Sequence, residues 1–286
     1  MLDNALNLIS LSLAFSLIGL NVFLTKKILN ITDLTCDASF ALGGCTYGMA
    51  MLCNMNPLLA FLFAISLGTL SGLVTSSFIN HVGMAPIISS VVTLVAVQTV
   101  VLKFTSIGRL MMREDIHSSL GTLSSLDNFV ITIVLVAALS FLFYRLVISE
   151  YGLAMRVCGS GQIIAESMGI QRSSVLFIGL AIGNMLSAVS GVLVAQIGGA
   201  FSAGMGLGSL VFGLSAIIIG ELLVCPKDIK EAFLSCFIGA FIYKAALGIF
   251  IGCCGNSEYN NLIMAVVFVC LIVISKEHHH KFGKII

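Results

Sequence analysis

The most conspicuous shortage in this 286-residue sequence is of charge. It has 14 Lys+Arg and 13 Asp+Glu, so charged residues make up 9% of the chain, whereas soluble domains contain about 25%. Hydrophobic residues make up 58%, and the mean hydropathy is +1.11. So few charges could not cover the surface of a soluble globule. The composition excludes a soluble enzyme domain, a disordered chain and a nucleic-acid-binding protein, and it predicts lipid as the main solvent.

Several motifs that carry chemistry are also absent. The sequence has no Gly-x-x-x-x-Gly-Lys-Ser/Thr phosphate loop, no His-Glu-x-x-His zinc motif and no Gly-x-Ser-x-Gly nucleophile motif. Its nine cysteines include no Cys-x-x-Cys pair, so most are expected to be small buried hydrophobic residues rather than zinc ligands. The short tract His278–His280 is expected to be a solvated tail. We therefore predict no catalytic residues, no metal, no cofactor and no ATP site in this chain.

Nine long apolar runs dominate what is present. About 20 apolar helical residues cross a bilayer core of about 30 Å. The runs are continuous rather than alternating, which favours helices over a barrel. They are Ala5–Leu24, Ala38–Met55, Leu58–Ile79, Met84–Leu102, Phe129–Ile148, Val175–Ile197, Ser209–Val224, Ala232–Ile251 and Asn261–Ser275. The expected fold is an all-α polytopic transmembrane helical bundle of about eight or nine spans. It would form a single domain over residues 1–275, with a tail at 276–286.

Basic residues are distributed unevenly between the loops. Ten of the 14 lie in or beside the loops 25–37, 80–83, 149–174, 225–231 and the tail from 276, and three lie in the 103–128 connection. Cytoplasmic loops carry the excess of Lys and Arg. We therefore expect the first set in the cytoplasm, the N-terminus outside and the C-terminus inside. Glycines divide the 149–174 loop, so short helical pieces such as Gln162–Met168 are expected there.

Polar residues in or beside the apolar runs need an explanation, because charge is costly at membrane depth. Asp33 and Asp37, at the start of the second run, either line a pathway or cap a helix. Glu221, near the end of the seventh run, is either functional or at the water interface, and Lys244, in the middle of the eighth, is either functional or paired internally with a carboxylate. Neutral polar residues of the sixth run either line a pathway or join helices by hydrogen bonds. The candidate pathway residues are Asp33, Thr35, Asp37, Ser39, Asn184 and Gln196.

Two segments together resemble a known family. The sequence Ile31-Thr-Asp-Leu-Thr-Cys-Asp-Ala-Ser-Phe40 resembles the Asp-Leu-Ser/Thr-x-x-x-Ser signature of certain ABC transporter permeases. These are the membrane subunits of importers for branched-chain amino acids, ribose-type sugars and related solutes. Residues 151–159 and 165–170 resemble the family pattern Gly-x-x-x-Arg-Ala-x-Gly followed by Ala-x-x-x-Gly-Ile, with Val157 where Ala is usual. The likeness runs from about residue 10 to 275 and is nearest to permeases for aromatic amino acids or similar small organic solutes.

The resemblance implies a function and a set of partners. The chain would be an importer's permease subunit in a bacterial inner membrane, without enzymatic activity of its own. Two ATP-binding subunits, an extracytoplasmic solute-binding protein and a second permease copy, identical or paralogous, would complete the assembly. The 149–174 loop would carry the helix that couples the permease to its ATPase, with contacts from Gly152, Arg156, Gly159, Glu166, Gly169 and Ile170. An ion-coupled secondary transporter using the buried charges, or a membrane scaffold, stays open as an alternative.

Overall fold

The computed structural model describes residues 2–111, 125–224, 226, 228–254 and 264–273. Every regular element within these residues is a helix, which confirms the predicted all-α class. The helices are α1 (Leu2–Val22), η1 (Phe23–Ile28, a π-helix), α2 (Thr35–Leu52), α3 (Pro57–His81), α4 (Pro86–Met111), α5 (Ser125–Ile148), α6 (Glu150–Ser160), α7 (Gln162–Ser167), α8 (Arg172–Gly198), α9 (Ser209–Val224), α10 (Ile229–Cys254) and a last helix, Met264–Val273. The predicted tail 276–286, with His278–His280, lies outside the described residues.

Within the described residues, each of the nine predicted apolar runs coincides with a helix over most of its length, and of the last run the structure describes Met264–Val273. Six helical segments are long and apolar enough to cross a membrane: Leu6–Ile28, Pro57–His81, Pro86–Ser106, Leu126–Ile148, Arg172–Gly198 and Glu231–Gly248. Helix α9 and the last helix are apolar but shorter. Helix α2 is the most polar of the nine, and its position explains why: 14 of its 18 residues are buried inside the bundle, where protein rather than lipid surrounds them.

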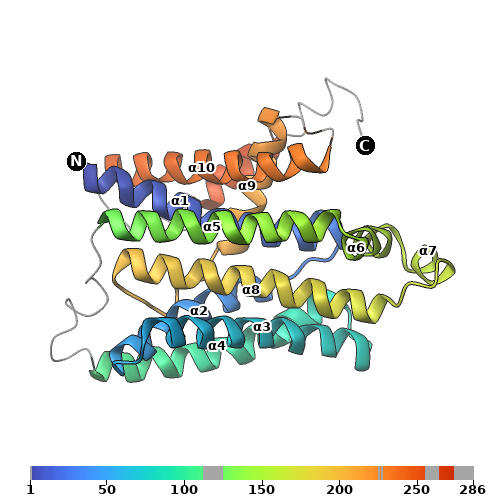
Figure 1. The fold of residues 1–286 in the computed structure, drawn as a ribbon, viewed down its shortest axis with the longest axis horizontal. Coiled ribbons are helices and arrows are strands. Elements are labelled where there is room, and N and C mark those ends of the chain that lie inside the picture. The colour runs from blue at the N-terminus through green and yellow to red at the C-terminus, as the bar shows by residue number, and fades with distance from the viewer. Residues whose placement is uncertain (1, 112–124, 225, 227, 255–263, 274–286) are drawn as a thin grey trace.

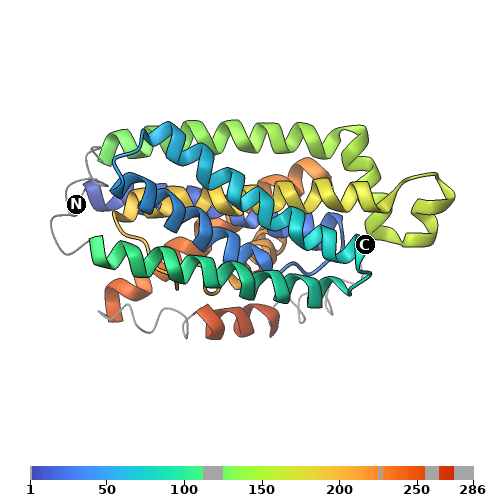
Figure 2. The ribbon, with the colours of Figure 1, turned by 90° about the horizontal axis from the view of Figure 1, so that it is seen from below.

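Helices α2 and α8 form the centre of the bundle. Helix α2 packs on α3, α4 and α8, and α8 packs on α1 and α3 as well. Helix α1 also contacts α5, α9 and α10, while α9 and α10 pack on each other. Figure 1 shows the long helices aligned along the longest axis of the molecule, with α6 and α7 projecting at one end. The turned view in Figure 2 shows the same projection. Hereafter this is the α7 end, and the other end of α8 is the Gly199 end.

Glycines allow α2 and α8 to approach closely. A Cβ added at Gly43 of α2 would overlap the backbone of Ala188, and one added at Gly191 of α8 would overlap the carbonyl oxygen of Phe40. Small residues at such contacts are typical of helix packing in membranes. Gly68 and Gly72 of α3 likewise face the backbone or side chains of α8.

Three contacts join neighbouring connections at the α7 end. Lys27 Nζ lies 2.7 Å from Glu221 Oε1, which joins the end of η1 to the end of α9. Asn80 Nδ2 donates to Ser173 O at 3.1 Å, which joins α3 to the start of α8. Gly159 of α6 packs on the backbone at the end of η1. Within the part of the chain that the structure describes, the ends of η1, α3 and α9 thus lie with α6 and the start of α8 at one end of the bundle.

Two segments re-enter the bundle, contrary to the sequence prediction. Residues 29–34, expected in a cytoplasmic loop, run back inside, where Asp33 is only 2% exposed and lies beside Asn184. Asn184 is twelve residues into α8, so this point is about 18 Å from the α7 end at 1.5 Å per residue. Residues 199–208, which lie between the sixth and seventh apolar runs, pack against α2, and Gly206 is buried there. Periodicity alone does not reveal such non-helical segments at membrane depth, where surrounding protein must satisfy their backbone groups.

Candidate functional sites in the core and at the α7 end

A central polar cluster, formed by Asp33, Thr35, Ser39, Ser71 and Asn184, joins α2, α3 and α8. Asp33 Oδ1 accepts hydrogen bonds from the backbone N–H of Thr35 at 2.9 Å and from its hydroxyl. Asp33 Oδ2 accepts from Asn184 Nδ2 at 2.9 Å. Three donors therefore surround a buried carboxylate that has no cation beside it among the described residues. Such an arrangement is the way a protein compensates for burying an ionised group.

The amide of Asn184 has one orientation in this cluster. Its Nδ2 also donates to Leu180 O at 3.0 Å, and its Oδ1 accepts from Ser39 Oγ at 2.6 Å. Ser39 Oγ lies 2.6 Å from Ser71 Oγ, which in turn donates to Gly68 O at 2.6 Å. Both N–H groups of Asn184 face acceptors and its oxygen faces a hydroxyl. Reversing the amide would therefore place its oxygen against the oxygens of Asp33 and Leu180. The cluster therefore defines how the three helices fit together.

Asp37 caps a different helix from its own. It lies in the first turn of α2, but its Oδ1 accepts from Ser209 Oγ at 2.6 Å and from the backbone N–H of Leu210 at 2.7 Å. Its Oδ2 lies 3.4 Å from the backbone N–H of Gly208. These groups begin α9, whose first N–H groups have no partner within the helix. A carboxylate there also meets the positive end of the helix dipole.

Two helices thus begin inside the bundle, each with an aspartate at its N-terminus. Asp33 accepts from the first residue of α2, and Asp37 accepts from the start of α9. The geometry observed is that of capping, which was one of the two interpretations open from the sequence. A pathway role for the cluster stays a prediction.

Of the six candidate pathway residues, the structure brings four into the central polar cluster and places Asp37 at the neighbouring helix start. Gln196 lies apart, because its Nε2 donates to Asn128 Oδ1 at 3.1 Å and so ties α8 to α5. Sequence reasoning missed Ser71 and Ser209. In the sequence, each is marked only as a serine within an apolar run or at its edge.

The other two intramembrane charges also have partners. Glu221 is paired with Lys27. The ammonium group of Lys244 lies 3.8 Å from the centre of the Phe15 ring, a cation–π contact between α10 and α1. The Glu221 side chain is 32% exposed in this pair, which fits the interfacial interpretation. Lys244 has an aromatic ring beside it instead of the carboxylate that one interpretation expected.

Three of the predicted coupling residues hold α6 against the bundle. A Cβ at Gly152 would overlap the Val147 carbonyl group, and one at Gly159 would overlap Ile28 O. Arg156 donates to Gly152 O at 3.2 Å and to Val147 O at 3.4 Å, so its guanidinium group caps the end of α5. The structure therefore places these three residues where α6 joins the bundle.

Helix α7, by contrast, presents an apolar face to the outside. Ile163 is 83% exposed, Met168 64% and Ile164 47%, whereas Ala165 is fully buried beneath them. Glu166 is exposed on the same short helix. Gly169 follows with a φ of +74° and open space around its Cα, so it can end α7 in the left-handed conformation at no steric cost. Exposed large apolar side chains on a helix that projects from the bundle (Figure 1) indicate a surface for a partner.

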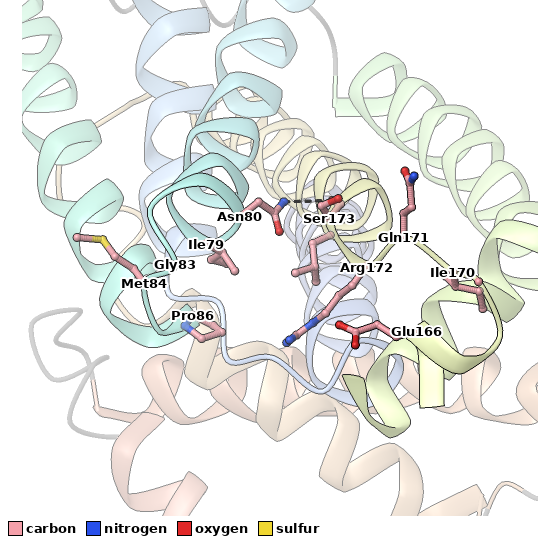
Figure 3. A pocket seen from close by; sticks show the side chains of 12 residues that line it. Ile79, Asn80, Gly83, Met84, Pro86, Glu166, Ile170, Gln171, Arg172 and Ser173 are labelled. Atoms are coloured by element: carbon pink, nitrogen blue, oxygen red, sulfur yellow. Dashed lines mark hydrogen bonds between the residues drawn. The ribbon is translucent and has the colours of Figure 1, made fainter. Parts of the chain in front are cut away.

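A polar cavity of about 850 Å³ separates the α7–α8 connection from the α3–α4 turn. Figure 3 shows Glu166 and Arg172 on one side of it, Ile79 and Met84 on the other, and the hydrogen bond from Asn80 to Ser173 across it. Glu166, Gly169 and Ile170, the remaining predicted coupling residues, all line this space. The six predicted coupling residues therefore divide into three that anchor α6 and three that border the cavity.

Residues 4–272 match the family model described as the branched-chain amino acid transport system permease component. The chain belongs to this family. It is accordingly a multi-pass membrane permease of the ABC transporter class, and the resemblance drawn from the two sequence segments is confirmed.

Individual relatives agree with the family. The tyrosine transport system permease protein of Clostridioides difficile (strain R20291) is 26% identical over 277 residues, which cover 95% of this chain and 91% of the relative. An uncharacterized Rickettsia prowazekii (strain Madrid E) protein, RP368, is 27% identical over 269 residues, covering 90% and 93%.

Two solved structures share the fold of this permease. An ABC transporter classed with the metal-chelate type, in an inward-facing conformation, gives a TM-score of 0.57 at 12% identity, covering 95% of this chain and 85% of that one. PsaBC from Streptococcus pneumoniae in complex with Fab gives 0.56 at 15% identity, covering 94% and 88%.

Proposed function

We propose that this permease is the membrane subunit of an ABC importer that moves a small solute, an amino acid or a similar molecule, across the inner membrane of a bacterium. An extracytoplasmic binding protein delivers the solute, two ATP-binding subunits supply the energy, and a second permease copy, identical or paralogous, completes the pathway. Residues 1–275 act as one permease domain. The family match and the relative named as a tyrosine transport permease support the solute class.

The observation that carries this proposal is the exposed apolar face of α7. The sequence has no phosphate loop of its own, so energy from ATP has to arrive through a contact with another protein. Helix α7 offers Ile163, Ile164 and Met168 for that contact. The described basic residues Lys26, Lys27, Arg156 and Arg172 lie at or near the same end, and by the positive-inside rule this supports a cytoplasmic α7 end. In the proposed topology the N-terminus is outside and the C-terminus inside.

Transport then follows from two alternative packings of the permease around the solute. The ATP-binding subunits close on each other when they bind ATP and move α7, and α6 passes this movement to the ends of α5 and η1 that it contacts. The central polar cluster keeps α2, α3 and α8 together, so these helices move as one body. Population shifts between outward-open and inward-open packings give alternating access to a solute at the permease interface.

The ion-coupled alternative relied on buried charges that could bind an ion or proton. Asp33 and Asp37 are occupied by donors of helix starts, Glu221 by Lys27, and Lys244 by the Phe15 ring. No described group favours that alternative over the ABC importer.

An Ile163→Glu variant is expected to lose ATP-driven uptake because it places a charge at the centre of the apolar face of α7. Buried anchors of protein interfaces typically contribute about 2 kcal/mol, or about thirtyfold in affinity. The measurement is co-purification of the ATP-binding subunit with the permease, together with uptake by cells expressing the complete transporter.

Two matched variants make this result specific. Ile163→Leu keeps an apolar side chain and should retain both readouts. Leu223→Ser removes a 59%-exposed apolar residue at the end of α9 and should leave the complex intact. Normal co-purification and uptake with Ile163→Glu, at wild-type membrane levels, would show that α7 is not the coupling surface.

A further inference from the structure

The start of α9 is capped by the carboxylate of Asp37, which belongs to α2. This contact breaks if the two helices separate. Asp37 of α2 supplies the acceptors for Ser209 and Leu210, 172 and 173 residues further along the chain. Asp37 is half-buried, whereas Asp33 is enclosed. Water can therefore reach Asp37 and the freed N–H groups if α9 moves away from α2, while the same separation at Asp33 would leave polar groups buried and unsatisfied.

The segment that precedes α9, residues 199–208 (the 199–208 strap), lies along α2 in a row of close contacts. A Cβ at Gly48 would overlap the ring of Phe201, one at Gly44 would lie 2.6 Å from Met205 Cε, and one at Gly206 would overlap Asp37 O. The strap thus fits into places on α2 where side chains are missing, and it does so over a length that ends at Asp37.

Few hydrogen bonds hold the strap between its two ends. Cys45 Sγ lies 3.5 Å from Ser202 O, and Gln98 Nε2 donates to Ala203 O at 2.9 Å. The strap is bordered by Gly199 with φ +61° and Gly208 with φ +87°. Both are left-handed conformations that glycine adopts without strain, so the backbone can pivot at both borders.

We propose that Asp37 is a latch and that the 199–208 strap is the moving gate it closes, at the Gly199 end of the permease. In the structure the latch is closed: Asp37 holds the start of α9, and the strap covers Cys45 of α2. When the transport cycle moves α9, the Asp37 bonds exchange for water and the strap lifts from α2. This inference rests on the proposed function, since it assigns a gate to the same transport cycle.

The thiol of Cys45 reports directly on the position of the strap. It is fully buried, with its Sγ beside Ser202 O and 3.6 Å from Thr105 Oγ1. The experiment uses the complete transporter in lipid nanodiscs, with Cys45 as the only cysteine of the permease, and follows labelling by N-ethylmaleimide. A second permease with only Cys236, which is 1% exposed, is the matched control.

Labelling of Cys45 is expected to become about tenfold faster during ATP turnover, and also in Asp37→Ala without ATP, because the strap is then released. Cys236 should stay protected in both cases. Asp37→Asn keeps an acceptor oxygen for Leu210 and should fall between wild type and Asp37→Ala.

Two outcomes would overturn the latch. One is protection of Cys45 in Asp37→Ala as complete as in wild type. The other is an equal increase in the labelling rates of Cys45 and Cys236, which would mean that the whole permease is loosened. Both outcomes are read from Asp37→Ala without ATP, so they stand even if ATP-driven uptake fails and the proposed function falls with it.

Discussion

A Gly191→Ala permease is expected to fold poorly and to reach the membrane in strongly reduced amount. The added methyl group would overlap the carbonyl oxygen of Phe40 and would lie 3.2 Å from the backbone N of Gly44. Neither atom belongs to a flexible side chain, so α2 and α8 would have to separate along the centre of the bundle. Overpacking at such a site costs about 3 kcal/mol. Membrane levels and the midpoint of thermal aggregation in detergent measure the effect.

Gly198→Ala provides the matched control on the same helix. Nothing lies within 4 Å of a Cβ added at Gly198, so this variant should behave as wild type or gain slightly in helix propensity. Equal stability of the two variants would mean that α2 and α8 are not packed as described.

An Asp33→Asn permease is expected to lose stability, and Asn184→Asp is expected to restore it in the double variant. With an amide at position 33, either its NH2 group faces the donor Asn184 Nδ2, or it faces the N–H and hydroxyl of Thr35. In each orientation one N–H donor faces another in a buried site. This lowers the free energy of unfolding by about 1–3 kcal/mol. The reciprocal exchange gives the new NH2 group a carboxylate acceptor and leaves Ser39 an oxygen to donate to. It removes the donor to Leu180 O, so the recovery is expected to be incomplete.

A double-mutant cycle on thermal stability measures this coupling. The double variant should be more stable than Asp33→Asn alone and should recover most of the uptake. If the stability losses of the two single variants add in the double variant, the assigned bond between Asp33 and Asn184 is contradicted. Gln196→Glu, which alters a polar residue of α8 outside the central polar cluster, serves as the control and should be insensitive to the residue at position 33.

The helices were predictable because lipid imposes a simple requirement on sequence. Each spanning helix needs a long apolar run, and the described parts of the nine runs lie mostly on helices. The re-entrant residues 29–34 and the 199–208 strap were not predictable in the same way. Protein rather than lipid surrounds these segments, so they need not be apolar or periodic, and both look like loops in the sequence.

The central polar cluster was predictable in its members but not in its bonds. Asp33 and Asn184 are both conspicuous in an apolar sequence, yet 151 positions separate them, and only the packing of α2 on α8 brings them together. The coupling loop shows the opposite case. Arg156 is conspicuous as a charge, but it donates a hydrogen bond to the end of α5. The exposed apolar residues of α7 are of a kind that is common throughout this sequence. Ile163 could be distinguished only once α6 and α8 were seen to leave it uncovered.

ATP-dependent uptake is the most direct test of the central claim. The permease should be expressed with its ATP-binding subunit and binding protein, and accumulation of radiolabelled amino acids, starting with L-tyrosine, should be followed with and without cellular ATP and with an uncoupler. The account predicts uptake that needs ATP, survives the uncoupler and disappears with Ile163→Glu. Uptake that survives ATP depletion but collapses with the uncoupler would contradict it, as would an ATP-binding subunit that fails to bind the permease.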